Sequence, residues 1–135
     1  MESSKFQFKG FFVRRSLFEQ SGKEASKDIS IAFSPRGVVN KENQTYQLLL
    51  EAKIEDESKS LNIEIEAVAN FIFDHKIDED TLKNMFFINA PALLFPYLRA
   101  YISSLTALSG LRPITLPTLN LTGLGKELEK NTIFE

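Results

Sequence analysis

Residues 89–105 read NAPALLFPYLRAYISSL, and this apolar stretch decides how the rest of the chain is arranged. Asn89 is a good N-cap, so the stretch predicts a helix that starts there. Pro91 would then lie in the first turn, where proline is tolerated because the N–H that it lacks has no helical partner. Pro96 follows about a turn and a half later, where a proline removes one backbone hydrogen bond and should kink the helix. The stretch is too apolar to lie on the surface of a small monomer.

The predicted helix carries apolar side chains on more than one side. One face holds Leu94, Leu98, Tyr101, Leu105 and Leu108, whereas Leu93, Phe95, Tyr97 and Ile102 point elsewhere. A helix of this kind needs two partners to pack against. We expect one partner to be the chain's own domain and the other to be a second copy. The predicted oligomer interface is formed by Leu94, Leu98, Tyr101, Ile102 and Leu105.

On the N-terminal side of the helix the hydrophobic pattern alternates with a period of two, which is typical of β-strands. It predicts four strands, at about residues 6–17, 28–39, 46–55 and 61–73. A change of parity at Gly10 indicates a bulge in the first strand. The last two strands have one apolar and one polar face, which predicts a half-buried antiparallel sheet.

After the strands, acids at residues 78–80 precede a short helix predicted at about 81–87, where negative charge complements the helix N-terminus. Gly110 and Pro113 end the central helix. Residues 110–120 read as an extended loop and residues 121–130 as a last short helix. The predicted class is therefore α+β, a four-stranded antiparallel sheet followed by helices in two layers. We expect one domain over residues 1–135, with the sheet at about 6–73 and the helices and loop at about 79–130.

Composition narrows the possible functions of the chain. It has 135 residues, 43% of them hydrophobic, no cysteine and a net charge of −2. That charge gives no overall attraction to nucleic acid or to anionic membranes, and the lack of cysteine is compatible with a reducing cytoplasm. The longest apolar stretch, residues 85–98, is shorter than the roughly 20 residues that a membrane span needs. With no secretory signal visible in residues 1–9, we expect a cytoplasmic protein without membrane insertion.

No catalytic constellation is visible in the sequence. One histidine, His75, and no cysteine cannot form a zinc site without several suitably spaced carboxylates. Glu64 and Glu66 are neighbours on the polar face of a strand, where two acids are usually only solvated. We therefore expect no enzyme activity, no metal and no cofactor.

The loop after the central helix leaves two interpretations open. Residues 111–124 offer apolar side chains without a regular burial spacing. The loop either folds onto the chain's own core or forms the wall of a groove for an extended apolar peptide.

Several motifs resemble the SecB family of protein-export chaperones: LFPYLR at 94–99, IS at 102–103, GLRPITLPTLN at 110–120 and KDIS at 27–30. The resemblance implies a homotetramer, a dimer of dimers with central helices between two sheets. It also implies an ATP-independent holdase that keeps unfolded preproteins translocation-competent and delivers them to SecA. The implied client grooves lie between the second strand and the loop plus last helix, at Ile31, Phe33, Val38, Leu111, Ile114, Leu116, Leu119, Leu121 and Leu124.

The same resemblance places SecA-binding acids at Asp28 and Glu66. A further family glutamate is replaced here by Ala32 or Phe33, and the family's acidic tail has no counterpart. One alternative within the family is a chaperone dedicated to an antitoxin of a toxin–antitoxin system. An alternative from a different class is a binder of a small apolar ligand.

Overall fold

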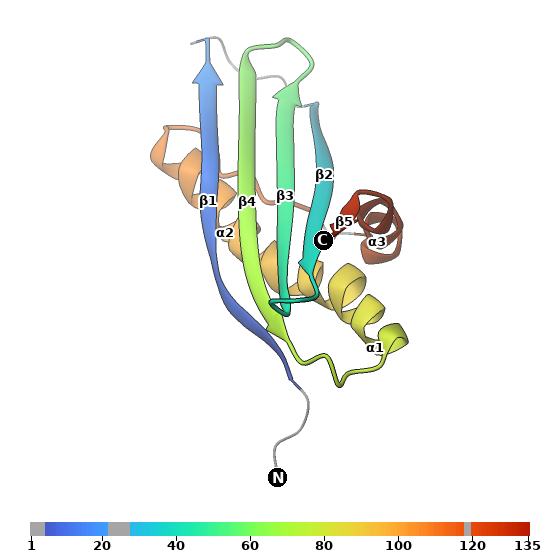
Figure 1. Ribbon diagram of the computed structural model, residues 1–135. Helices are drawn as coiled ribbons and strands as arrows, with labels where there is room; N and C mark the ends of the chain where they lie inside the picture. Colours follow the sequence, from blue (N-terminus) through green and yellow to red (C-terminus); the bar gives the residue numbers. More distant parts are fainter. Residues whose placement is uncertain (1–4, 22–27, 118–119) are drawn as a thin grey trace.

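The computed structural model describes residues 5–21, 28–117 and 120–135 (Figure 1). Four long strands form an antiparallel sheet, and a short fifth strand pairs in parallel with one edge. The strands are β1 (Phe6–Gln20), β2 (Ile29–Asn40), β3 (Thr45–Asp56), β4 (Leu61–Phe73) and β5 (Thr132–Phe134), in the order β1-β4-β3-β2-β5. The predicted α+β class with a sheet followed by helices is confirmed, and β5 is an addition to it.

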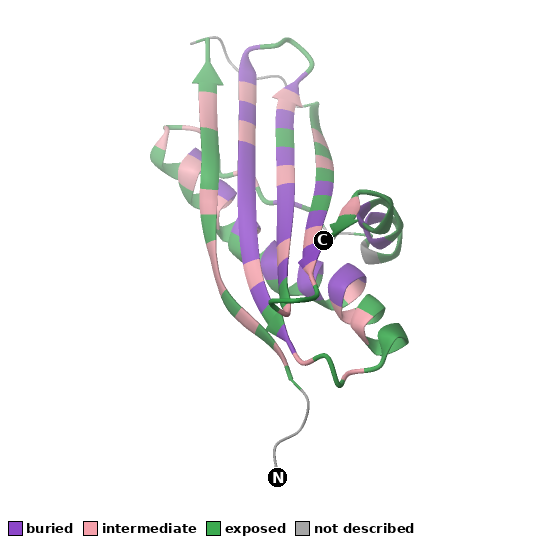
Figure 2. Cartoon of the chain, in the orientation of Figure 1, coloured by how far each residue is buried: buried purple, intermediate pink, exposed green. Residues whose placement is uncertain are grey.

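Alternating side chains explain why the four long strands form one sheet with a single core face. Figure 2 shows burial concentrated on β3 and β4, the two central strands. The register of β1 against β4 shifts between Phe8 and Gly10, where Gly10 has a φ of +136°, so the predicted bulge lies there.

One continuous helical segment packs on the core face of the sheet, while α3 (Leu121–Lys130) lies beside β2 (Figure 1). The segment comprises α1 (Glu79–Asn84), a π-helical turn (Met85–Asn89) and α2 (Ala90–Leu108). The predicted helix start at Asn89 was wrong, because Asn89 has helical dihedral angles and caps nothing. The helix begins after Asp78, whose carboxylate accepts a hydrogen bond from the Thr81 N–H at 3.0 Å.

The π turn explains how the helix tolerates Pro91. The Ala90 N–H donates to the Met85 carbonyl, so in this register the Phe86 carbonyl would receive the N–H of residue 91, which proline lacks. The hydroxyl of Tyr46 donates to that carbonyl instead, at 2.9 Å. Burial raises the pKa of Tyr46 and keeps the hydroxyl protonated as a donor.

The central helix buries one face on the sheet of its own chain. Leu94, Leu98 and Ile102 are fully buried there, which corrects their assignment to an oligomer interface: they have no surface left for a second copy. Tyr101 and Leu105 are half-buried against the same core, and the Tyr101 hydroxyl donates to Ser16 Oγ at 2.7 Å. The helical spacing correctly identified an apolar face that is buried, but the residues that we expected to contact a second copy pack on the chain's own sheet.

The outer face of the same helix remains apolar and exposed. Leu93 and Tyr97 keep 44% and 46% of their surface accessible. By length and composition alone Glu79–Leu108 could cross a membrane, a test that core helices also pass, and 44% of its most apolar window is buried within the chain.

Candidate functional site

The predicted groove begins on β2, where Ile31 and Phe33 lie half-buried on the side of the sheet that faces the helices. The ring of Phe33 meets the ring of Phe95 edge-on, with centroids 5.9 Å apart. Val38 has the opposite parity and lies on the other face of the sheet, since side chains alternate along a strand. The structure therefore unites Ile31 with Phe33 and separates Val38 from them.

The loop after α2 is folded onto the core of its own chain. Leu111 and Ile114 are half-buried against the core, and Leu116 is fully buried. Thr106, buried in α2, holds the loop in place: its Oγ1 accepts from the Ile114 N–H at 2.9 Å, and its carbonyl accepts from the Leu111 N–H at 3.1 Å. The interpretation that the loop folds onto the chain's own core therefore holds for Leu116, whereas Leu111 and Ile114 remain partly exposed.

Thr106 is a positioning residue that the sequence reasoning missed. The available signal was a hydroxyl side chain within an otherwise apolar helix, followed by a loop with few polar groups of its own. A threonine hydroxyl can accept from a neighbouring chain while donating to the helix carbonyl four residues earlier. Its Oγ1 donates to the Ile102 carbonyl at 2.9 Å, which leaves its lone pairs for the loop.

Helix α3 also faces inward with its apolar residues. Leu124 and Leu128 are buried, so the predicted client contact at Leu124 has little surface to offer. Gly125 allows α3 to approach the π turn, since a Cβ there would lie 2.8 Å from the Phe87 carbonyl. The predicted groove residue Leu119 and the side chain of Leu121 lie outside the described residues.

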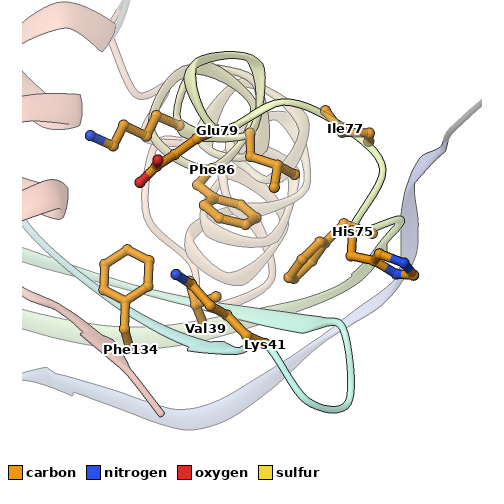
Figure 3. Close-up of a pocket in the computed structure, with 10 residues that line it drawn as sticks. Val39, Lys41, His75, Ile77, Glu79, Phe86 and Phe134 are labelled. Carbon is orange, nitrogen blue, oxygen red and sulfur yellow. The ribbon is translucent and has the colours of Figure 1, made fainter.

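A cavity of about 320 Å³ opens beside β2, and none of the predicted groove residues lines it (Figure 3). Its lining is mostly apolar, with charged side chains at the rim. The lining residues are Val39, Lys41, Phe73, His75, Ile77, Glu79, Leu82, Lys83, Phe86 and Phe134. Sequence reasoning missed it because β2, β4, the first helical turns and β5 each contribute only one to a few of these residues.

The predicted SecA-binding acids are far apart on the folded chain. Glu66 of β4 and Ser34 of β2 both pair with Glu51 of β3, so the three residues lie in one row across the sheet. Ser34 is six residues from Asp28 along the chain, which is about 20 Å in an extended strand. The Glu66 carboxylate pairs with the guanidinium groups of Arg14 and Arg36, the latter at 3.0 Å. The Glu66 side chain is 10% exposed and that of Arg36 is 61% exposed, so the arginines cover the acid.

Among the described residues, no group of three or more His, Asp or Glu side chains could hold a metal ion. His75 is exposed, and its Nδ1 lies 2.9 Å from Gln44 Oε1.

Sequence comparisons give one consistent family. A family model described as "Preprotein translocase subunit SecB" matches residues 4–131. The protein-export protein SecB of Jannaschia sp. is 27% identical over 136 positions, which cover 91% of this chain and 79% of that protein. SecB of Anaplasma phagocytophilum is 30% identical over 43% of this chain, and an uncharacterized protein of Methanocaldococcus jannaschii is 39% identical over 38%. These last two matches span only 37% and 33% of those relatives.

Two solved structures have a similar fold. The Mycobacterium tuberculosis SecB-like chaperone in complex with a ChAD peptide from the HigA1 antitoxin has a TM-score of 0.70 and 19% identity, covering 85% of this chain and 88% of that one. A protein of unknown function from Streptococcus agalactiae has a TM-score of 0.54 and 10% identity, covering 87% of this chain and 100% of that one. At these identities the two likenesses describe the fold.

Proposed function

Because this chain belongs to the SecB family, we propose that it is a non-enzymatic, ATP-independent holdase that binds extended apolar segments of unfolded proteins. The observation that carries the proposal is the apolar surface of β2: Ile31 and Phe33 lie half-buried on this strand, and an aromatic-lined cavity lies at its far end. Folded monomers rarely leave such surface without a partner.

The energetics of this surface favour unfolded clients over folded ones. Each large apolar client side chain that is buried contributes about 1.5–3 kcal/mol. Several weak contacts along one client chain add through effective concentration, which gives affinity without a fixed sequence. A folded protein hides these side chains and its backbone donors, so it gains neither contribution.

The direct test measures whether the purified chain suppresses aggregation of a chemically unfolded client, without ATP, by light scattering. We expect protection at near-stoichiometric ratios. Phe33→Ser should weaken client binding, while the matched substitution Val38→Ser, on the same strand but the opposite face, should not. Absence of protection by the unaltered chain would refute the holdase proposal.

We further propose a cytoplasmic homotetramer, a dimer of dimers, as the family resemblance implies. The support from this chain is the outer side of α2, where Leu93 and Tyr97 lie one turn apart and exposed. Beside Leu93 lies a hollow of about 400 Å³, lined also by Phe6 and Met85. Covering this surface with a second copy would remove apolar area from water.

Delivery to SecA is a separate proposal, and we place it on Asp28 and Glu66 as the resemblance does. The arginines over Glu66 reduce the negative charge that this face presents, so Asp28 is the more accessible acid. Asp28→Asn is expected to weaken binding of purified SecA in calorimetry without changing client protection. Unchanged SecA affinity would remove Asp28 from this role.

A second candidate function is protection of a single antitoxin, which the likeness to the antitoxin-bound mycobacterial chaperone favours. A dedicated chaperone would bind one antitoxin peptide tightly and fail to protect unrelated clients. Binding of a small apolar ligand in the cavity would instead be revealed by a stoichiometric molecule in mass spectra of the native protein.

A further inference from the structure

The short strand β5 pairs with one end of the β2 edge of the sheet, which α3 also contacts. It pairs in parallel with residues 37–39 of β2, and within the described part of the chain no strand lies on the outer side of residues 29–36. The Gly37 N–H donates to the Asn131 carbonyl at 3.3 Å, and the Glu135 N–H donates to the Val39 carbonyl at 2.8 Å. Gly37 permits this approach, because a Cβ there would lie 2.8 Å from Thr132 Oγ1.

Both large side chains of β5 remain exposed. Ile133 keeps 62% and Phe134 keeps 51% of its surface accessible. The strand therefore gains little from apolar burial and depends largely on a few backbone hydrogen bonds. Elements held in this way open at low free-energy cost compared with core strands.

The side chains of β5 show how an extended segment uses this edge. Phe134 pairs with Val39 and forms a wall of the 320 Å³ cavity, together with Phe86 (Figure 3). Lys41 Nζ lies 5.6 Å from the centre of the Phe134 ring. Ile133 has the opposite parity and pairs with Val38 on the other face. The site therefore combines backbone pairing with an aromatic side chain at the cavity.

Beyond β5 the same edge continues toward Ile31 and Phe33. Outward-facing N–H groups recur at every second residue of an edge strand. Because the Gly37 N–H points outward, the N–H groups of Phe33 and Ile31 point outward as well. Pro35 lacks an N–H and interrupts the row, and its carbonyl accepts from Asn131 Nδ2 at 3.3 Å. A segment longer than β5 thus finds backbone donors that β5 does not use.

We propose that the edge of β2 and the adjoining cavity form a strand-addition site for extended, aromatic-containing client segments, and that β5 is an intramolecular competitor which a client displaces. This inference rests on the holdase function proposed above. The client replaces Phe134 with its own aromatic side chain and then extends along the open part of the edge. A chain without client keeps the hydrogen-bonding end of the edge covered, which limits edge-to-edge association.

The test locks β5 in place in the full chain with Val38→Cys and Ile133→Cys. The sequence has no other cysteine. Paired residues on neighbouring strands lie about 4.8 Å apart, within the span of a disulfide. The probe is a fluorescein-labelled peptide with four Thr-Ile-Phe repeats separated by lysines, and its binding is measured by fluorescence anisotropy. We expect the oxidised protein to bind about tenfold more weakly than the same protein reduced, the factor that two backbone hydrogen bonds supply.

A second pair of variants keeps the proposal falsifiable should the disulfide not form. Phe134→Ala removes the β5 side chain from the wall of the cavity and leaves that space to an aromatic side chain of the client, so the probe should bind more tightly than to the unaltered chain. Ile133→Ala, on the other face of β5, is the control and should change binding less. The proposal that β5 competes with the client would be overturned if the oxidised and reduced proteins bound the probe equally well. It would also be overturned if Phe134→Ala and the unaltered chain bound the probe equally well.

Client protection by the unaltered chain, measured in parallel, separates this inference from the holdase proposal. Protection together with indifference to the lock refutes the role of β5 alone. Lack of protection refutes the holdase function, while a lock-sensitive affinity for the probe still supports strand addition at this edge.

Discussion

Glu66 lies on the polar face of β4, yet its carboxylate is enclosed by Arg14 and Arg36. The alternating pattern correctly predicted which face of the strand it occupies. The pattern could not predict the pairing, because Arg14 and Arg36 come from strands 52 and 30 residues away in sequence. An acid on a polar strand face is therefore not by itself an accessible docking charge.

Replacing Glu66 with lysine should destabilise the fold. The new ammonium group would face two guanidinium groups, and their repulsion replaces an attraction that is partly screened by solvent. We expect Glu66→Lys to lower the free energy of unfolding by about 2 kcal/mol, measured by urea denaturation. Glu66→Gln, which removes the charge without reversing it, should cost less. An unchanged urea midpoint for the lysine variant would show that the ion pairs contribute nothing.

Asp78 links the start of the helical segment to pH. Hydrogen bonds from the Thr81 hydroxyl and N–H lower the pKa of Asp78 below its usual 3.8. A depressed carboxyl pKa contributes stability above the unfolded-state value, and this stability is lost as the pH falls through the folded-state pKa. We expect Asp78→Ala to lower the melting temperature at pH 7 and to lower it less as the pH falls below 3.8, because the stability that depends on the ionised carboxylate is lost there. Asp80→Ala, without a cap hydrogen bond, is the control; an effect of Asp78→Ala that stays equally large in acid would contradict the assignment.

At the scale of elements, regular hydrophobic periods were sufficient to predict four strands and the last helix. Irregular features escaped prediction, because they depend on contacts between distant segments. The π turn forms where Pro91 cannot donate and Tyr46 can, and the loop is held by Thr106 rather than by its own pattern. The three-residue β5 is too short to show a period, and it packs where Gly37 has no Cβ to meet the Thr132 side chain.

The π turn makes a prediction that couples Tyr46 to Pro91. Tyr46→Phe leaves the buried Phe86 carbonyl without its donor and should cost about 1–3 kcal/mol of unfolding free energy. Pro91→Ala restores a backbone N–H at the position that would otherwise serve this carbonyl. In urea denaturation, Tyr46→Phe should therefore cost less in the Pro91→Ala background than in the unaltered chain. Strictly additive effects would contradict this account.

At the scale of the whole molecule, the central helix has two apolar sides with different partners. Residues 89–105 predicted two packing partners for the helix. One of them is the chain's own sheet, which covers Leu94, Leu98 and Ile102. The assignment of faces failed because a helix that is apolar nearly all round gives no periodic signal to separate them. The side left exposed, with Leu93 and Tyr97, is the one available to a second copy.

Leu93→Asp is therefore expected to break the proposed oligomer while leaving the subunit folded. Leu93 is 44% exposed in the single chain, so the aspartate stays solvated there but would be buried against a second copy. In a two-fold interface the residue is lost twice, which should weaken association by about 100-fold or more. Light scattering coupled to gel filtration measures the mass, and circular dichroism checks the fold. Ile72→Asp, with similar exposure on the opposite face of the sheet, is the matched control and should keep the mass. A Leu93→Asp protein with the mass of the unaltered oligomer would move the interface away from α2.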